Sequence, residues 1–153
     1  MVDSRAKGAR TELAARDLLR KHTGLNWERV PGSGALDEKH GLKGDLYIPN
    51  EKNMYCVEVK GYAGDHVTSA LLTSKSPQLL DFWKQALRQG QQVKKRPLLI
   101  FKYDRSKFFV AIDVADYIPT DTHPYIFINR EGLCFYIMLL EDWLQHEQPK
   151  FTA

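Results

Sequence analysis

The sequence has few cysteines and no long apolar run, and these absences exclude several classes of protein. Its 153 residues contain only Cys56 and Cys134, which are not spaced as a CxxC pair. A zinc ribbon and a disulfide-stapled scaffold are therefore not indicated, and a reducing cytoplasm is the expected compartment. No segment is long and apolar enough to span a membrane, and the N-terminus lacks the apolar core of a signal peptide.

The chain also has little net charge, but its charges are unevenly distributed. A formal charge of +3, with 43% hydrophobic and 27% charged residues, is typical of a soluble globular protein. Basic residues are dense near the N-terminus and form a second cluster further along: Arg5, Lys7, Arg10, Arg16, Arg20, Lys21 and Arg29, then Lys94-Lys95-Arg96. Such clusters fit either a nucleic-acid-binding face or ordinary solvated helix surfaces.

Hydrophobic periodicity and turn residues predict a single α/β domain over residues 1–153. Helices are expected at 4–22, 77–90 and 139–146, the second with Ser76 as N-cap and Pro77 at its first position. Strands are expected at 25–30, 45–49, 54–60, 97–102, 108–114, 125–129 and 133–138. The segment 62–77 has no clear periodicity and is expected to be a flexible loop. The pattern predicts a central mixed β-sheet flanked by helices, with a core at about 5–115 and a C-terminal hairpin and short helix at about 120–148.

Two charged residues interrupt the apolar run 54–61. Glu58 and Lys60 are two positions apart, so on a strand they share one face at a separation of about 7 Å, while Val57 and Val59 point to the other. Burying two charges costs several kcal/mol unless they are paired or bind something. Asp45 begins the preceding β-rich segment, so adjacent strands would bring two acids and a lysine together. This combination indicates a hard-metal site suited to phosphodiester hydrolysis.

The order of four features resembles a known family. Glu12 lies on the first predicted helix after Lys7-Gly8, the loop Pro31-Gly-Ser-Gly34 follows the first strand, Gly44-Asp45 opens the second, and Glu58-Val-Lys60 ends the third. This set resembles the PD-(D/E)xK nuclease superfamily, and specifically the archaeal-type Holliday junction resolvases. The resemblance covers roughly residues 5–103, including a helix that begins with Gln78.

The resemblance implies a restriction-endonuclease-like fold and a role for each matching residue. It implies Mg²⁺ bound by Asp45, Glu58, the Val59 carbonyl and Glu12, with Mn²⁺ able to substitute, and Lys60 and Ser33 acting at the scissile phosphate. The DNA-binding residues implied are Arg5, Lys7, Arg10, Arg29, Ser33 and Gln78. The expected activity is structure-selective endonucleolytic resolution of four-way (Holliday) junctions. The expected partners are branched DNA and a second copy of the chain, in the cytoplasm, which is the host's if the protein is viral.

Several alternatives stay open at the level of sequence. The substrate could instead be linear or flapped DNA cut by a restriction-like or repair nuclease, or the chain could be a non-catalytic DNA-binding module of the same fold. Glu12 could simply pair with Arg16 one helical turn away, and Ser33 and Gln78 could serve only their turn and helix start. The dimer interface is expected on a sheet edge or on the second helix near Leu79, Phe82 and Trp83.

Overall fold

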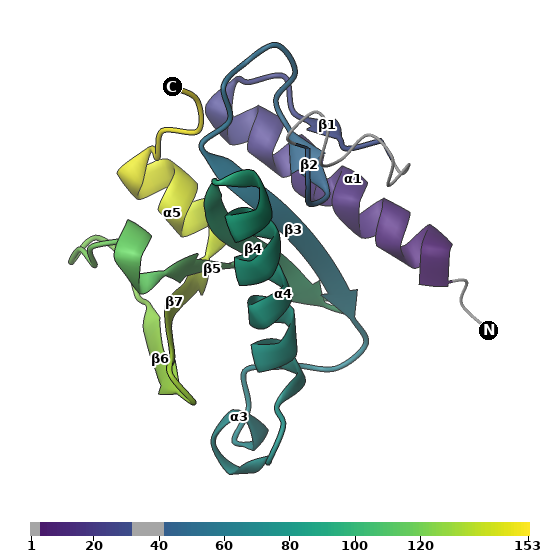
Figure 1. Cartoon of the computed structure of the whole chain (residues 1–153). Coiled ribbons are helices and arrows are strands. Elements are labelled where there is room, and N and C mark those ends of the chain that lie inside the picture. Colours follow the sequence, from purple (N-terminus) through teal and green to yellow (C-terminus); the bar gives the residue numbers. More distant parts are fainter. Residues whose placement is uncertain (1–3, 32–41) are drawn as a thin grey trace.

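The structure is a computed structural model that describes residues 4–31 and 42–153, without the side chains of residues 4–6. Its core is a seven-stranded sheet in the order β1-β2-β3-β4-β5-β7-β6, with helices on both faces (Figure 1). The elements are α1 (Ser4–Thr23), β1 (Glu28–Arg29), β2 (Leu46–Tyr47), β3 (Tyr55–Tyr62), α3 (Ala70–Thr73), α4 (Gln78–Val93), β4 (Arg96–Tyr103), β5 (Phe109–Asp113), a 3₁₀ turn (Val114–Asp116), β6 (Ile126–Arg130), β7 (Leu133–Leu139) and α5 (Leu140–Glu147).

The sheet is mixed, as the sequence predicts. β3 and β4 are parallel and are joined through α4, because parallel neighbours require a crossover connection. The other neighbouring pairs are antiparallel, and β6 and β7 form the expected C-terminal hairpin. This hairpin extends the same sheet, since β7 pairs with β5 along its length. The register Glu58↔Leu99 places the predicted site residues in the middle of the β3–β4 ladder.

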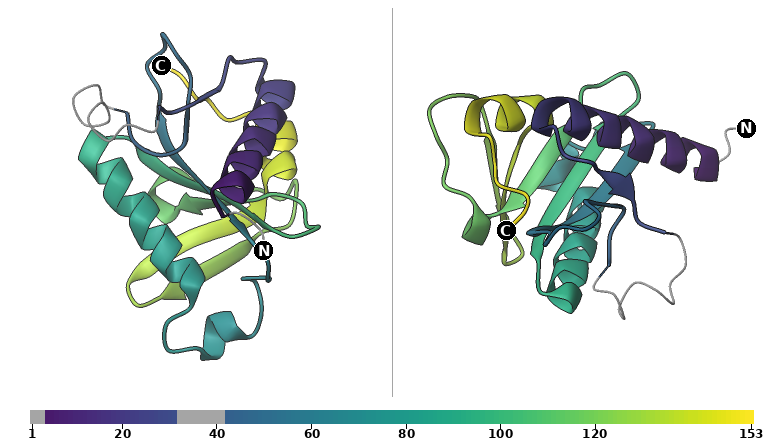
Figure 2. Two further views of the ribbon diagram at one scale, coloured as in Figure 1. Left: turned by 90° about the vertical axis from the view of Figure 1, so that its right-hand side faces the viewer. Right: turned by 90° about the horizontal axis from the view of Figure 1, so that it is seen from above.

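The two faces of the sheet carry separate hydrophobic cores. On one face α1 and α5 pack against residues such as Val57 and Val59, and on the other α4 covers the sheet, with Leu71 of the short α3 in the same core (Figure 2). Leu79 and Trp83 of α4 are 1% and 0% exposed and belong to this second core. The expectation of a dimer interface at these two residues is therefore wrong, because the apolar stripe of α4 already faces its own sheet.

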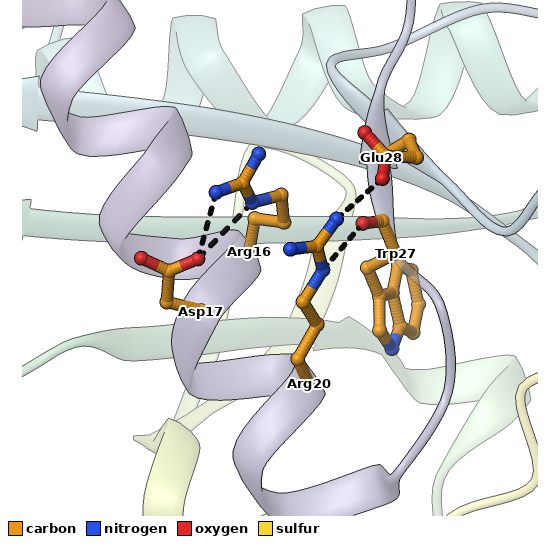
Figure 3. Close-up of polar contacts among 5 residues, drawn as sticks. All are labelled: Arg16, Asp17, Arg20, Trp27 and Glu28. Atoms are coloured by element: carbon orange, nitrogen blue, oxygen red, sulfur yellow. Dashed lines mark hydrogen bonds and ion pairs between the residues drawn. The ribbon is translucent and has the colours of Figure 1, made fainter.

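A cluster of polar contacts fastens β1 to α1. Arg20 donates from Nε to the Trp27 carbonyl at 2.8 Å and pairs with the Glu28 carboxylate (Figure 3). Arg16 pairs with its neighbour Asp17 at 2.9 Å, not with Glu12 one turn earlier. The alternative in which Glu12 serves only as a helical partner of Arg16 is therefore not what the structure shows.

The remaining differences from the predicted elements are local. The expected loop 62–77 contains the short helix α3, and Pro77, not Ser76, is the N-cap of α4. β2 is only two residues long because the Ile48 amide donates to the Asn53 side chain at 2.8 Å, which closes the turn before β3. Within residues 4–31 and 42–153, the helices are too short or too polar to cross a bilayer.

Candidate active site

β3 presents Glu58 and Lys60 to the face covered by α4. Val57 and Val59 alternate with them and pack into the opposite core, as predicted from the strand periodicity. Glu58 is 4% exposed, and the Lys60 Nζ lies 3.9 Å from its Oε2 atom. The same Nζ lies 5.4 Å from the centroid of the Phe82 ring on α4. The lysine is thus held between a carboxylate and an aromatic face.

Asp45 is clipped onto β3 from the turn that precedes β2. Its amide donates to the Val57 carbonyl at 2.7 Å, and its Oδ2 accepts from the Val59 amide at 2.7 Å. Gly44 makes this approach possible, because it has φ +85° and a Cβ there would lie 2.5 Å from the Val57 oxygen. The backbone therefore fixes the Asp45 carboxylate beside Glu58.

Val59 supplies a further oxygen on the same side. Its amide points toward Asp45, and in a strand the amide and carbonyl of one residue point to the same neighbouring strand. The ladder between β2 and β3 has its register pair at Leu46↔Val57, so Val59 lies beyond that pairing. Its carbonyl consequently faces the open edge of β3 near the Asp45 carboxylate.

Burial and mutual repulsion disfavour the state in which both carboxylates are ionised. Burial, and then the charge of Asp45, raise the pKa of Glu58 to about 8, with Lys60 acting in the opposite direction. Burial also raises the pKa of Asp45, although its hydrogen bond from Val59 and the charge of Lys60 oppose this. The contact between the two side chains raises the pKa of Glu58 and lowers that of Asp45. A cation between them would relieve the repulsion between the two carboxylates.

The donor set fits a hard divalent cation. Two carboxylates and a backbone carbonyl offer oxygen ligands alone, which is the preference of Mg²⁺. Among the residues that the structure describes, no group of three His, Cys, Asp or Glu side chains is close enough together to hold a metal ion. The fit therefore rests on Asp45, Glu58 and the Val59 carbonyl, with water and phosphate oxygens as the remaining ligands.

Glu12 reaches the site from α1 but is engaged elsewhere. Its Oε1 accepts from the Arg29 Nε of β1 at 3.1 Å. Burial, and then the charge of Asp45, raise the pKa of Glu12, while Arg29 and Lys60 lower it. Glu12 is thus within electrostatic reach of the carboxylate pair, with Arg29 as its present counter-ion. Its role as a metal ligand stays a prediction.

Four side chains around Glu58 were missed by the sequence reasoning. Gln89 of α4 hydrogen-bonds the Glu58 carboxyl, and its own Oε1 is buried without a partner. Tyr62 and His66 also have a buried hydroxyl and a buried Nε2 without partners. Tyr62 stacks on Phe82 at 4.8 Å, and His66 packs edge-on against Tyr62 at 3.8 Å.

Two sequence signals could have identified this group. Tyr62 continues the alternation of Glu58 and Lys60 on one face of β3. Phe82 and Gln89 are seven residues apart on α4, and this spacing places them on one face of the helix. The glutamine predicted to contact DNA was instead Gln78, which is exposed at the start of α4.

Other predicted residues lie away from this group or outside the described part. Ser33 and the side chain of Arg5 are not among the described residues. Lys7 and Arg10 lie on a different side of α1 from Glu12. There they line a groove between α1 and the end of β4. The structure therefore brings together Glu12, Asp45, Glu58 and Lys60, with Arg29 beside Glu12.

The sequence matches a known family over nearly its whole length. The model of the family described as "Phage putative PDDEXK endonuclease" matches residues 3–152. The chain belongs to this family. Its resemblance to PD-(D/E)xK nucleases is thereby confirmed, as is the restriction-endonuclease-like arrangement of a mixed sheet between helices. That Glu58-Val59-Lys60 of β3 forms the last part of the pattern in the family's name stays a prediction from the sequence.

The proteins similar to this chain include a phage protein and an archaeal Holliday junction resolvase. Protein D14 of Escherichia phage T5 is 43% identical over 150 residues, which cover 95% of this chain and 94% of the phage protein. A solved structure of Archaeoglobus fulgidus Hjc, a Holliday junction resolvase, overlaps with a TM-score of 0.43 at 14% identity, covering 90% of this chain and 87% of that one. The family assignment rests on the sequence match, since this structural overlap is limited.

Proposed function

We propose that this member of the PDDEXK endonuclease family is a structure-selective, divalent-metal-dependent endonuclease that resolves four-way DNA junctions by phosphodiester hydrolysis. The observation that carries the hydrolytic part is the pair formed by buried Glu58 and half-buried Asp45, which is hydrogen-bonded to β3, with the Lys60 Nζ 3.9 Å from Glu58. Two carboxylates that offer hard oxygen ligands, with a lysine ammonium beside them, are the groups that phosphodiester hydrolysis needs. The junction as substrate comes from the resemblance of the residue pattern to the junction resolvases.

Asp45, Glu58 and the Val59 carbonyl would hold Mg²⁺, or Mn²⁺ in its place. When bound, the ion supplies Lewis acidity toward the phosphate and lowers the pKa of the attacking water. Lys60 is confined between Glu58 and Phe82, so its ammonium is aimed into the site and stabilises negative charge that develops on the phosphate. Gln89 orients the Glu58 carboxyl through its hydrogen bond. Glu12 would join Asp45 and Glu58 as a third acid when Arg29 leaves it to bind a phosphate.

The basic residues would contact the phosphate backbone. We assign this role to Arg5, Lys7, Arg10, Arg29 and Gln78, with Ser33 at a phosphate near the cut. These contacts give affinity without reading base sequence. The Lys94-Lys95-Arg96 cluster lies at the start of β4 and Lys102 near its end, so cations flank both ends of the strand that neighbours Glu58.

A homodimer would supply the two cuts that resolution requires. A four-way junction has approximate two-fold symmetry, and a C₂ dimer presents two equivalent sites at a fixed separation. With the buried face of α4 excluded, the sheet edge remains as the expected interface. β6 is an edge strand, and it exposes Ile126 at 41% and Phe127 at 47%. A related phage protein fits action in the cytoplasm of an infected host.

The principal alternative keeps the chemistry and changes the substrate to linear or flapped DNA. It shares the Asp45–Glu58 carboxylate pair, and it differs in predicting no preference for branched DNA. A non-catalytic DNA-binding module is a weaker alternative. Binding DNA without cutting it does not require a lysine held beside two acids, whose carboxyl pKa values are raised by this arrangement.

The deciding experiment is cleavage of a synthetic four-way junction beside linear duplexes of its arms, with and without Mg²⁺. The expected result is paired cuts in opposed strands of the junction that require Mg²⁺ and leave the duplexes intact. Asp45→Asn and Glu58→Gln should abolish cutting and keep junction binding near wild type, because the phosphate contacts lie elsewhere. Cutting by both variants would contradict the site, and equal cutting of junction and duplex would favour the alternative substrate.

A further inference from the structure

A cationic groove lies between α1 and the end of β4, away from the carboxylate pair. Its volume is about 480 Å³. Four cationic side chains and one acid line it, together with Thr11 and Ala14: Lys7, Arg10, Lys102 and Arg105, with Asp104. Lys7 pairs with Asp104 at 2.9 Å, which ties α1 to the turn after β4 and cancels the only acid of the lining. The groove therefore keeps a positive charge after internal pairing.

Two of its cations are available for an anionic ligand. Within the described part of the chain, neither Arg10 nor Arg105 has an ion-pair partner, whereas Lys102 lies over the Phe108 ring at 5.4 Å. A guanidinium presents parallel N–H donors that match phosphate oxygens in a two-point contact. Two free guanidinium groups in one groove thus suit an extended phosphodiester backbone.

The backbone at Arg105 adds a second reason. Arg105 has φ +67°, in the left-handed region where a residue with a Cβ is strained by roughly 1–2 kcal/mol. The turn is held by Ser106, whose Oγ accepts from the Tyr103 amide at 3.1 Å. Glycine or asparagine would suit this position better, so an arginine here points to a use of its charge.

The groove does not face the same way as the catalytic site. Arg10 and Ala14 each lie two residues from Glu12, which is about 200° around a helix. Glu12 points toward β1 through Arg29, while the groove opens on the other shoulder of α1, beside β4. Lys102 follows the alternation of Leu98 and Ile100, which face α1, whereas Lys60 lies against Phe82 of α4, so the sheet separates the groove from Glu58 and Lys60. Figure 1 shows the N-terminal half of α1 extending to the end of β3.

We propose that this groove binds the phosphate backbone of a second DNA segment, different from the segment that is cut. This inference rests on the proposed function, and it names the feature that would distinguish branched from linear DNA. A duplex held at Glu58 leaves the groove empty, whereas a junction can place another arm in it. Arg105 and Lys102 are then DNA-contacting residues in addition to those predicted from the sequence.

The test is the double variant Arg10→Gln/Arg105→Asn in the full-length protein. Asparagine tolerates the left-handed conformation, so this change removes two charges without straining the turn. The matched control is Lys21→Gln/Lys52→Gln, which removes two exposed charges at the C-terminal end of α1 and in the turn before β3. Dissociation constants are measured for a four-way junction and for a duplex of equal arm sequence, in EDTA, over a range of salt concentrations.

We expect the groove variant to lower the preference for junction over duplex about tenfold. We also expect the salt dependence of junction binding to fall by a slope of about 2, because two phosphate contacts release fewer counterions. The control variant should keep the wild-type ratio and slope. An unchanged ratio in the groove variant would overturn the proposal, and so would an equal loss for junction and duplex.

The outcome is separable from that of the proposed function. Wild-type cutting of junction and duplex tests the activity, whereas the binding ratio in EDTA tests the groove alone. If the wild-type protein cuts junctions and the groove variant has an unchanged ratio of junction to duplex binding, the proposed function stands and the groove proposal fails. Thermal melting of both variants confirms that each is folded.

Discussion

At the residue scale, the central question is how Glu58 is kept in place while it is buried beside another acid. It is 4% exposed, and its charged form is opposed first by burial and then by Asp45. Lys60 and the Gln89 amide act in its favour. Since a buried carboxylate needs such partners, we expect Lys60 and Gln89 to be as necessary to the site as Glu58 itself.

The first prediction concerns Gln89. Gln89→Ala removes the hydrogen bond that orients Glu58, so the Mg²⁺ concentration for half-maximal cutting should rise about 10–100-fold. Gln92→Ala, at an exposed position of the same helix, is the matched control and should leave that concentration unchanged. Titration of the cutting rate with Mg²⁺ is the measurement. A Gln89 variant that loses thermal stability but keeps the wild-type Mg²⁺ dependence would argue against a positioning role.

A second prediction at this scale concerns Arg29, which pairs with Glu12 at 3.1 Å. Because Glu12 and a phosphate compete for the same guanidinium, Glu12→Gln should free Arg29 and strengthen DNA binding in the absence of metal. The same change should lower the cutting rate, since it removes a charge near Asp45. Binding in EDTA and single-turnover cutting separate the two effects. Weaker binding would show that Arg29 does not contact the backbone.

At the element scale, the turn before β2 decides where Asp45 lies. Gly44 has φ +85°, and an added Cβ would meet the Val57 carbonyl at 2.5 Å. Gly44→Ala should therefore destabilise the protein by about 1–3 kcal/mol and shift Asp45 away from Val59. Gly64→Ala is the control, because a Cβ at Gly64 meets nothing within 4 Å and that glycine has no positive φ. Denaturant unfolding and cutting rates should change together in the Gly44 variant alone.

The loop before β6 is joined to α5 by a contact between buried His123 and half-buried Glu147. The His123 Nε2 lies 2.5 Å from the Glu147 Oε2, which also accepts from the Tyr117 hydroxyl at 2.5 Å. Burial lowers the pKa of His123, but the Pro124 carbonyl and Glu147 outweigh it, with Asp142 adding to them, and the net pKa is raised. His146 also faces it, with ring centroids 6.0 Å apart.

This pair predicts a pH dependence of stability. A histidine whose pKa is raised on folding contributes stability that is complete below its unfolded pKa and is lost as pH rises through the folded pKa. His123→Gln should therefore cost about 2 kcal/mol at pH 5 and clearly less at pH 8.5. Urea unfolding of both proteins at the two pH values is the measurement. An equal cost at both would mean that His123 is held by packing and not by its charge.

At the scale of the whole molecule, the free edge of the sheet sets the expected assembly. β6 pairs with β7 on one side, and its exposed side chains include Ile126 and Phe127. Apolar side chains on an open edge strand favour pairing with another strand. A second copy related by two-fold symmetry would place the two β6 strands antiparallel, which joins the two sheets.

Phe127→Lys should therefore shift the protein toward monomer and reduce paired cutting of a junction. Ile118→Lys is the control, because Ile118 is 85% exposed and lies outside β6. Sedimentation of the free and junction-bound proteins measures the assembly. A wild-type protein that is monomeric in both states would contradict the dimer, and a dimer that persists in Phe127→Lys would place the interface elsewhere.

The sequence by itself determined the elements and the nature of the chemistry. Local periodicity is a property of neighbouring residues, so α1, α4 and the strands from β3 to β7 were predicted within a few residues of their ends. The alternation of Glu58 and Lys60 with two valines is also a local pattern, so it could be recognised without knowing which elements pack against β3. By contrast, α3 was missed, because four residues carry too little periodic signal.

Only the tertiary structure decided which distant residues meet. The contact of Gln89 with Glu58 depends on how α4 crosses β3, and the ion pair of Glu12 with Arg29 depends on where β1 lies beside α1. The same packing turned Leu79 and Trp83 inward and left the edge of β6 open. It also brought Arg105 into the same groove as Arg10, 95 positions away in the sequence. Such contacts follow from burying both faces of one sheet, and no local pattern records that outcome.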